Sequence, residues 1–136
     1  MTKSRHVIRS ASLTFRGFAL TLEDVESIIG TPSGLSGIRG KPAKHGVSTL
    51  LKRSFASYEV NFIEGCRLDE MIPKLLDSLG GVDHLNEAKQ KINPDFFEIN
   101  LVLPVKYSED QEGGFLPPST LAAIARLGAT LSFSFL

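Results

Sequence analysis

The chain has 136 residues, which is a usual length for one domain built around a single hydrophobic core. Hydrophobic residues make up 42% and charged residues 22%, a balance that excludes a wholly disordered, collagen-like or coiled-coil protein. Fifteen basic side chains offset fifteen acidic ones, so the net charge favours neither a nucleic acid nor an anionic membrane as partner. We therefore expect one domain over residues 1–136, and we do not expect nucleic acid binding.

The cysteine count and the N-terminal sequence indicate the compartment. Cys66 is the only cysteine, which rules out an intrachain disulfide and a cysteine metal cluster. The N-terminal stretch "MTKSRHVIRSASLTF" lacks the apolar run of a secretory signal. No segment approaches the roughly 20 consecutive apolar residues of a membrane span. These features predict a cytoplasmic protein with no membrane partner.

In the first half of the chain, strand patterns and helix patterns alternate. Residues 11–15 ("ASLTF") alternate between apolar and hydroxyl side chains, as in a half-buried strand. The segment "TLEDVESIIG" predicts a short helix that begins after Thr21 and ends at Gly30. Residues 55–63 alternate again and predict a second strand. A helix is expected over residues 68–79, with Asp69 as its cap.

The second half repeats the same kinds of element. A short helix is expected over "VDHLNEAKQKI", followed by a third strand, "FFEINLVL", which ends before Pro104. After the acidic turn "YSEDQEGG", Pro118 fits the first turn of a last helix and Gly128 fits its C-terminal stop. The closing strand, "TLSFSFL", is expected to turn three apolar side chains toward the core: Leu131, Phe133 and Phe135.

The order of these elements predicts the fold class. It is strand–helix–strand, then helices, then strand–helix–strand, and each strand has one polar face. This order predicts an α+β two-layer sandwich with ferredoxin-like split β-α-β halves and a helical insertion between the second and third strands. One face of the sheet is then left open, with small polar side chains on it. Its expected aromatic candidates are Phe18, Phe55 and Phe96.

The C-terminal segment "GGFLPPSTLAAIARLGATLSFSFL" resembles a bacterial family described as domain of unknown function 4279. The likeness consists of a Gly-Gly-Phe segment, a helix with leucine-type spacing, a glycine stop and a terminal alternating strand. Here these features are Gly113, Gly114, Phe115, Leu121, Ile124, Leu127, Gly128, Leu131 and Phe133. Pro117 stands where the family has a serine-type cap, and a tryptophan expected near Phe55 or Tyr58 is absent. The resemblance implies the fold of that family and a bacterial cytoplasmic context. It implies no activity.

The stretch "GLSGIRGKPAKHG", residues 34–46, is the segment of the chain most suggestive of a ligand site. A Walker A loop would need Ser or Thr after Gly-Lys and would lie between a strand and a helix, but Pro42 follows Gly40-Lys41 here. The GXXG grip of an RNA-binding KH module should lead directly into a helix, and Pro42 and Gly46 oppose one. Neither motif is therefore predicted to work as such.

What remains in this stretch is local positive charge. From Ser27 to Tyr58 there is no acidic residue. Such a segment can steer an acidic partner or hold an anion, or it can be a solvated, mobile connection. The candidate partner- or anion-binding residues are Arg39, Lys41, Lys44, His45, Lys52 and Arg53.

No catalytic or metal constellation is evident in the sequence. Cys66 precedes a predicted helix start, where a thiol can have a lowered pKa and act as a nucleophile, or can simply fill a turn. The histidines, His6, His45 and His84, lack zinc-site spacing, and each is expected at the surface. We therefore predict no cofactor and no metal site.

The prediction for function is a non-enzymatic module, of the immunity or accessory type, that binds another protein. Its contacts are expected on the open sheet face and the basic stretch. The alternative is an anion- or nucleotide-ligand module that uses the basic glycine-rich loop, residues 34–53. The exposed sheet edges also leave room for a dimer.

Overall fold

A computed structural model describes residues 9–42, 46, 49–62, 66–104 and 114–136. Within these ranges the chain is α+β, with four helices and one mixed sheet of five strands. In chain order the elements are β1 (Arg9–Arg16), α1 (Leu22–Ile29), β2 (Leu35–Gly37), β3 (Phe55–Phe62), α2 (Leu68–Ser78), α3 (Val82–Ile92), β4 (Phe96–Leu103), α4 (Pro118–Leu127) and β5 (Thr130–Phe135). None of the described helices is long and apolar enough to cross a membrane.

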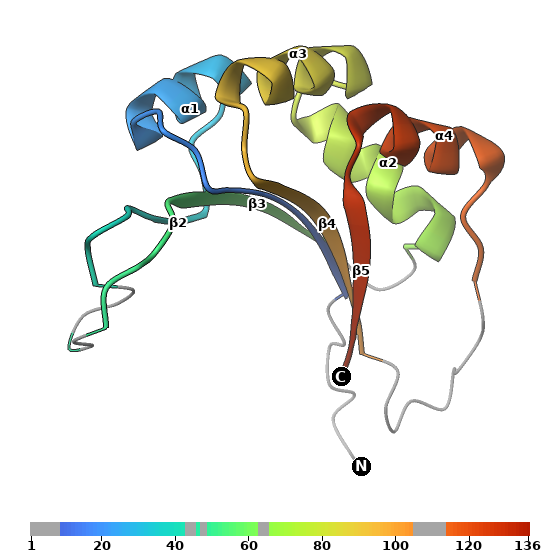
Figure 1. The fold of residues 1–136 in the computed structure, drawn as a ribbon. Helices are drawn as coiled ribbons and strands as arrows, with labels where there is room; N and C mark the ends of the chain where they lie inside the picture. Colours follow the sequence, from blue (N-terminus) through green and yellow to red (C-terminus); the bar gives the residue numbers. More distant parts are fainter. Residues whose placement is uncertain (1–8, 43–45, 47–48, 63–65, 105–113) are drawn as a thin grey trace.

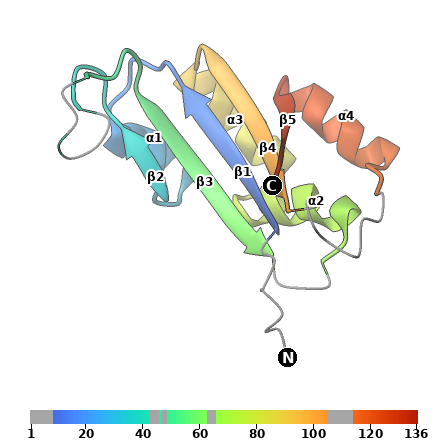
Figure 2. The same cartoon turned by 90° about the horizontal axis from the view of Figure 1, so that it is seen from below.

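The strands lie in the order β2-β3-β1-β4-β5. β1 is the middle strand and pairs antiparallel with β3 on one side and with β4 on the other. β2 adds to the outer side of β3, antiparallel to it, while β5 adds to β4 as a parallel strand. Figures 1 and 2 show the resulting curved sheet, with the helices gathered on one of its faces.

The elements are grouped differently from the two halves that the sequence suggested. The predicted first half joined strands 11–15 and 55–63 through one helix, but β1 and β3 are adjacent antiparallel neighbours. The predicted second half joined strands 96–103 and 131–135, and β4 and β5 are direct parallel neighbours with no strand between them. The reason is a strand that the sequence analysis missed: β2 follows α1, and the chain then turns back into β3.

β2 escaped prediction because it has little local signal. It is three residues long, and both Gly34 and Gly37 lie in or beside it. Its place is set by β3: the Gly34 N–H donates to the Ser57 carbonyl at 3.0 Å. A side chain at Gly37 would collide with Leu51 and Phe55, so this close approach of segments requires glycine.

The core lies between the sheet and the helices. The predicted alternation is confirmed for β1, β3 and β4, whose inward side chains are buried against α1, α2 and α3. Phe18 was expected on the open face, but it is buried in this core. The inward residues of these strands are Ala11, Leu13, Phe15, Ala56, Tyr58, Phe62, Phe97, Ile99, Leu101 and Leu103.

The closing strand departs from this pattern. Phe133 and Phe135 were predicted to be core residues, but they are 45% and 56% exposed. Their side chains lie on the helix side of the sheet, since they pair in register with Leu101 and Leu103. α4 packs against α3 and α2, which leaves the outer part of β5 uncovered.

Helix ends follow the expected capping with one exception. The Thr21 hydroxyl accepts from the Asp24 N–H at 3.1 Å, and Gly30 ends α1 in the left-handed region at φ 91°. The N-cap residue of α2 is Arg67, whereas Asp69 was predicted. Asp69 lies in the first turn instead, where its carboxylate accepts from the Arg67 Nε at 3.0 Å.

Two side chains of α3 tie the helices together. His84 was predicted at the surface, but it is part-buried and its Nε2 lies 2.7 Å from the Ile29 carbonyl at the end of α1. The Lys89 ammonium donates to the Leu127 carbonyl at 2.6 Å and also lies over the Phe97 ring. A cation at the last carbonyls of α4 stabilises that helix end.

We predict that Gly17→Ala destabilises the protein. Gly17 has φ 79°, its N–H donates to Ser54 and its carbonyl accepts from Asp95, so it links the ends of three strands. A left-handed conformation costs an L-residue roughly 1–2 kcal/mol, and the added methyl group would also collide with Asp95. Denaturant unfolding should therefore show a loss of at least that size. Gly34→Ala is the matched control, because its methyl group would meet only ordinary contacts; equal losses for both would contradict the prediction.

Candidate functional site

A row of aromatic and cationic side chains crosses the open face of the sheet. The strand register places Arg16 of β1 directly between Phe55 of β3 and Phe96 of β4. The Arg16 guanidinium lies over the Phe55 ring, 5.6 Å from its centroid. Phe96 is 54% exposed although it is a large apolar residue in the sheet. We call Arg16, Phe55 and Phe96, together with Arg53, the Arg–Phe row.

Arg53, which lies in the segment just before β3, completes the row. Its guanidinium lies 5.1 Å from the centroid of the Phe96 ring, and its Nε is 3.8 Å from an Asp95 carboxylate oxygen. Both ion-pair partners are about half exposed or more, so the pair adds little stability. Its effect is to orient Arg53 over Phe96 and leave a planar cation and a ring available to a partner.

Beyond this row the open face is mostly polar, with Leu35 of β2, in register with Ser57, as an exposed apolar residue. The Thr14 and Ser57 hydroxyls are 2.9 Å apart across β1 and β3. The Asn100 Oδ1 accepts from Ser132 at 2.8 Å and from Ser134 at 3.3 Å, which links β4 to β5. The sequence analysis expected this character from the alternation, but it could not supply the register that brings these residues together.

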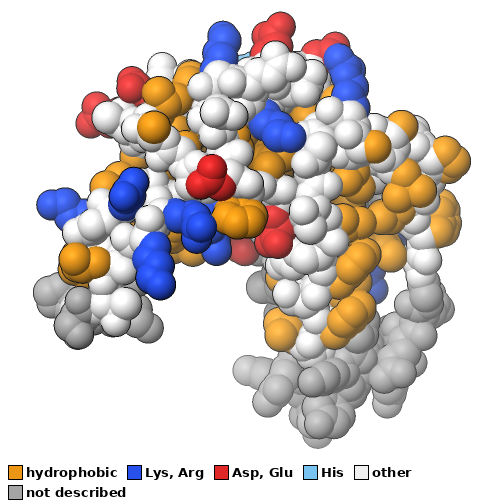
Figure 3. All heavy atoms as spheres, viewed as in Figure 1, with side chains coloured by type: hydrophobic (Ala, Val, Ile, Leu, Met, Phe, Trp, Pro, Cys, Tyr) orange, Lys and Arg blue, Asp and Glu red, His pale blue; other side chains and the backbone are white. Residues whose placement is uncertain are grey.

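The predicted basic residues lie beside the Arg–Phe row and do not converge on one point. Figure 3 shows Lys and Arg side chains gathered over β2 and the segment after it, which projects from the sheet in Figure 1. Of the six candidates, Arg39, Lys41, Lys52 and Arg53 are exposed, and only Arg53 belongs to the row. Lys44 and His45 lie outside the described residues.

The described backbone of the glycine-rich loop is already hydrogen-bonded within the chain. The Arg39 N–H donates to the Ser54 hydroxyl at 2.9 Å, and the Gly40 N–H donates to the Leu51 carbonyl at 2.9 Å. The Lys41 N–H donates to Ile38 at 3.1 Å. A phosphate cradle needs such donors free and pointing at the ligand. These three donors therefore do not form one.

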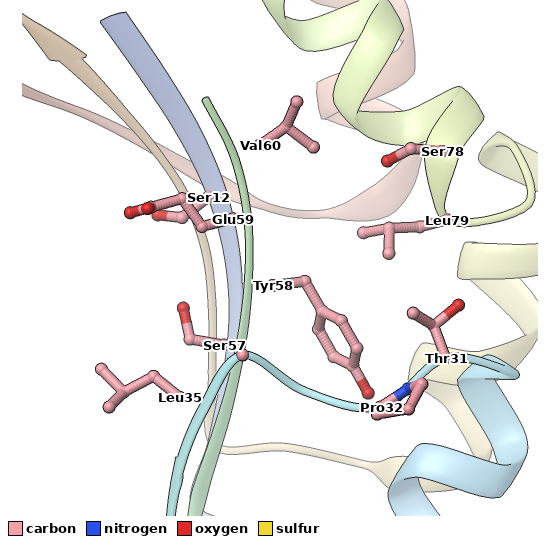
Figure 4. A pocket seen from close by; sticks show the side chains of 11 residues that line it. Ser12, Thr31, Pro32, Leu35, Ser57, Tyr58, Glu59, Val60, Ser78 and Leu79 are labelled. Atoms are coloured by element: carbon pink, nitrogen blue, oxygen red, sulfur yellow. The ribbon is translucent and has the colours of Figure 1, made fainter. Parts of the chain in front are cut away.

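A cleft of about 680 Å³ lies at the outer edge of β3. β2 pairs only with Phe55–Ser57, so β3 has no described partner on that side from Tyr58 onward. Figure 4 shows Tyr58 and Val60 on the helix side of β3, facing Thr31, Pro32 and Leu79. Ser57 and Glu59 lie on the opposite side. Tyr58 and Glu59, its titratable lining residues, are thus kept apart, and no acid–base pair is formed between them.

Tyr58 has an unusual environment in the wall of this cleft. It is 3% exposed, and its hydroxyl has no hydrogen-bond partner among the described residues. Burial raises the pKa of Tyr58 to about 12, and the nearby Glu26 carboxylate adds to the effect. The sequence analysis placed Tyr58 in a predicted strand but could not find the missing partner, which depends on segments distant in the chain, such as those that carry Pro32 and Leu79.

We predict that Tyr58→Phe is neutral or stabilising near pH 7. A buried hydroxyl without a partner costs about 1–3 kcal/mol, and phenylalanine removes it at nearly constant shape. The folded pKa of about 12 exceeds the ordinary value of 10.0, so the folded state keeps the proton longer. Ionisation of Tyr58 therefore has no effect on stability below pH 10, and the folded state loses stability relative to the unfolded chain as the pH rises from 10.0 toward about 12.

The measurement is the urea midpoint of both proteins at pH 7 and in steps through the alkaline range. The wild type should lose stability relative to Tyr58→Phe as the pH rises. A variant that is less stable at pH 7, with parallel curves at alkaline pH, would contradict the prediction and would indicate a hydrogen bond to the hydroxyl.

Cys66 does not have the environment of an activated nucleophile. It is partly buried, and its thiol lies 3.6 Å from the Arg67 carbonyl. Burial raises the pKa of the Cys66 thiol, with Lys74 partly opposing that shift. The sequence left two interpretations of Cys66 open, and the raised pKa favours the residue that fills a turn over the nucleophile.

We predict slow alkylation of Cys66 in the folded protein. A raised pKa lowers the thiolate fraction at pH 7, and thiolate is the reactive form. Iodoacetamide should label Cys66 more slowly in native buffer than in urea, as followed by intact-protein mass spectrometry. A folded protein that reacts faster than the unfolded chain would contradict the structure and reopen a nucleophilic role.

Within the described residues, no group of three or more His, Cys, Asp and Glu side chains gathers to hold a metal ion. Comparison with known proteins found no matching family model, no matching curated protein and no matching solved structure.

Proposed function

We propose that this chain is a non-enzymatic module that binds another protein through the open face of its sheet. The observation that carries the proposal is the Arg–Phe row: Phe96 is 54% exposed and held under Arg53, on an otherwise polar face. Isolated exposed apolar residues are common on proteins, but the Phe96 ring is exposed beside two guanidinium groups, with Arg53 over it and Arg16 in register with it. Their orientation suits recognition.

The chemistry of this face resembles that of protein interfaces. Arginine and aromatic residues are enriched at interface centres, where they supply most of the binding energy. The surrounding hydroxyl and amide groups, such as Thr14 and Asn100, can make adaptable hydrogen bonds or hold bridging water. A sheet also holds these groups rigidly, which lowers the entropy cost of binding.

Charge favours a partner that is acidic near the row. Arg16 and Arg53 lie within it, and the exposed Arg39 and Lys41 lie on the neighbouring segment after β2. A local concentration of positive charge accelerates the encounter with an acidic surface and aligns the partner. Glu98, which pairs in register with Thr14, bounds the positive region along β4.

The anion- or nucleotide-ligand alternative has less support. It would rely on the loop at residues 34–53, whose described backbone donors at Arg39, Gly40 and Lys41 are already used. We therefore favour the protein-interaction proposal over it.

We further infer a ferredoxin-like two-layer arrangement for the first four strands. The order β2-β3-β1-β4, with α1 between β1 and β2 and with α2 and α3 between β3 and β4, supports it. In this grouping β1 and β2 run parallel with β3 between them, and α4 and β5 are additions at the far edge. We also propose membership of the bacterial family described as domain of unknown function 4279, and a cytoplasmic location, on the sequence features given above.

The test is capture of a partner by the open face. Immobilised wild-type protein is exposed to an extract of its own host at low salt, and retained proteins are identified and then titrated individually. Phe96→Ala should weaken the affinity for the retained partner by roughly 30-fold or more, as for an interface hot spot. Arg53→Ala should act in the same direction.

Phe115→Ala is the matched control. Phe115 is 56% exposed and lies 5.9 Å from the Arg67 guanidinium, so it reproduces the exposure and the stacking away from the sheet face. The same partner should bind this variant with wild-type affinity. If Phe96→Ala and Phe115→Ala both bind like the wild type, the open face is not the interface and the proposal fails.

A further inference from the structure

β5 is an edge strand without the usual protection against strand pairing. The Leu136 N–H donates to the Leu103 carbonyl, so the even-numbered residues of β5 turn their backbone groups toward β4. By alternation, the N–H and C=O groups of Leu131, Phe133 and Phe135 point away from the sheet. The strand sequence, TLSFSF, contains no charged residue and no proline, which are the devices that natural edge strands use to block pairing.

The surface around this edge is apolar. Phe133 and Phe135 stack with ring centroids 6.1 Å apart, and both rings are about half exposed. α4 adds Leu121, which is 50% exposed, together with the exposed Ala122 and Ala125. Figure 3 shows hydrophobic side chains gathered over β5 and α4. α4 thus has an apolar outward face beside the polar side that Ser119 and Arg126 form.

α4 does not cover the last residues of β5, since Phe133 and Phe135 are about half exposed. Figures 1 and 2 both show α4 beyond β5, at the end of the sheet, and α4 packs against α3 and α2. A strand added to β5 would therefore come to lie beside α4. It would also complete the cover over Phe133 and Phe135, which the chain's own helices leave exposed.

The exposed area is of the size that an interface needs. An aromatic side chain carries about 150–250 Å², so Phe133 and Phe135 leave roughly 100 Å² each exposed at 45% and 56%. With Leu121, which is 50% exposed, the apolar patch reaches roughly 300 Å², within the range of functional patches on monomers. The β5 backbone edge and the alanines of α4 extend it toward the roughly 800 Å² per partner of a stable interface.

We propose that β5 pairs antiparallel with β5 of a second copy of this chain, about a two-fold axis at Phe133. In this register Phe133 faces its own copy, and Leu131 faces Phe135 of the second copy. The outward N–H and C=O groups of all three residues then find partners, and the two sheets become one continuous sheet. The aromatic side chains meet on the helix side as cross-strand pairs.

A second copy fits this edge because the edge is self-complementary. Across a two-fold axis at Phe133, any charge at that position would meet the same charge in its own copy. β5 carries no charged side chain. The three residues whose backbone groups point away from the sheet, Leu131, Phe133 and Phe135, are all apolar. The opposite edge is divided between the three-residue β2 and the part of β3 from Tyr58 onward, whose edge borders the cleft lined by Thr31, Pro32 and Leu79. This interface leaves the open face with its Arg–Phe row free, and it is independent of the function proposed above.

The first experiment measures the mass of the full chain in solution by analytical ultracentrifugation over a range of concentrations. The wild type should be a dimer that dissociates on dilution. Phe133→Lys places like charges at the axis and should give a monomer at every concentration tested. Leu35→Lys is the matched control, since Leu35 is 65% exposed on the other edge strand, and it should remain dimeric. Circular dichroism checks that both variants are folded.

A monomeric wild type would overturn the proposal and leave this edge to a different partner. A dimer that survives Phe133→Lys would overturn it as well.

The second experiment tests the register by cysteine cross-linking in a Cys66→Ala background. Hydrogen-bonded antiparallel neighbours have Cα atoms about 5.5 Å apart, which is within the range for a disulfide. Phe133→Cys should therefore yield a covalent dimer on mild oxidation. Phe135→Cys should not, because its two copies lie four residues apart along the paired strands. Cross-linking of Phe135→Cys without Phe133→Cys would overturn the proposed axis.

Discussion

The structure depends on the one-sided burial of its central strand. β1 pairs on both sides, and its inward residues, Ala11, Leu13 and Phe15, are fully buried. Phe15 packs against Tyr58 and Phe97 from the two flanking strands, so one aromatic cluster joins β3, β1 and β4. Most apolar side chains of the three strands lie on this face, and the helices cover it. Among the described residues no layer covers the other face, whose side chains are mostly polar.

That division of faces also shapes the candidate binding surface. A pleated sheet fixes the positions of side chains on its open face through hydrogen bonds made elsewhere, in the backbone ladder. Arg16 is held between Phe55 and Phe96 in this way, without any buried contact of its own. Gly17 then turns the backbone away, where it meets Ser54 and Asp95. Strand pairing therefore fixes the backbone positions of Arg16, Phe55 and Phe96, while Arg53 joins the row from the segment before β3.

At the β5 end of the sheet, the position of α4 determines which side chains are exposed. α4 connects β4 to its parallel neighbour β5, and Lys89 of α3 holds the last carbonyls of α4. The helix is thus fixed to the other helices, and the outer half of β5 stays uncovered. The exposed phenylalanines on this strand are consequences of where α4 is anchored. Another chain can bury such an apolar patch without any change to the core.

The sequence by itself determined the local elements and the side of each that is apolar. Alternation identified β1, β3 and β4 and their buried faces, while Thr21, Gly30 and Gly128 marked helix ends as the structure has them. These features are local, because they depend on periods of two and 3.6 residues and on single capping contacts. It also placed Phe55 and Phe96 on the face opposite the core, and it identified the exposed basic residues.

Only the tertiary structure decided which strands are neighbours and in what register. The short strand β2, the burial of Phe18, the exposure of Phe133 and the unpartnered Tyr58 hydroxyl all depend on segments distant in sequence. The same holds for the Arg–Phe row, which requires Arg16, Arg53 and Phe96 to meet from three separate segments. The spacing of apolar residues predicts which face of its element a residue occupies. Its neighbours on that face are chosen by packing across the whole sheet, and a single sequence does not encode that packing locally.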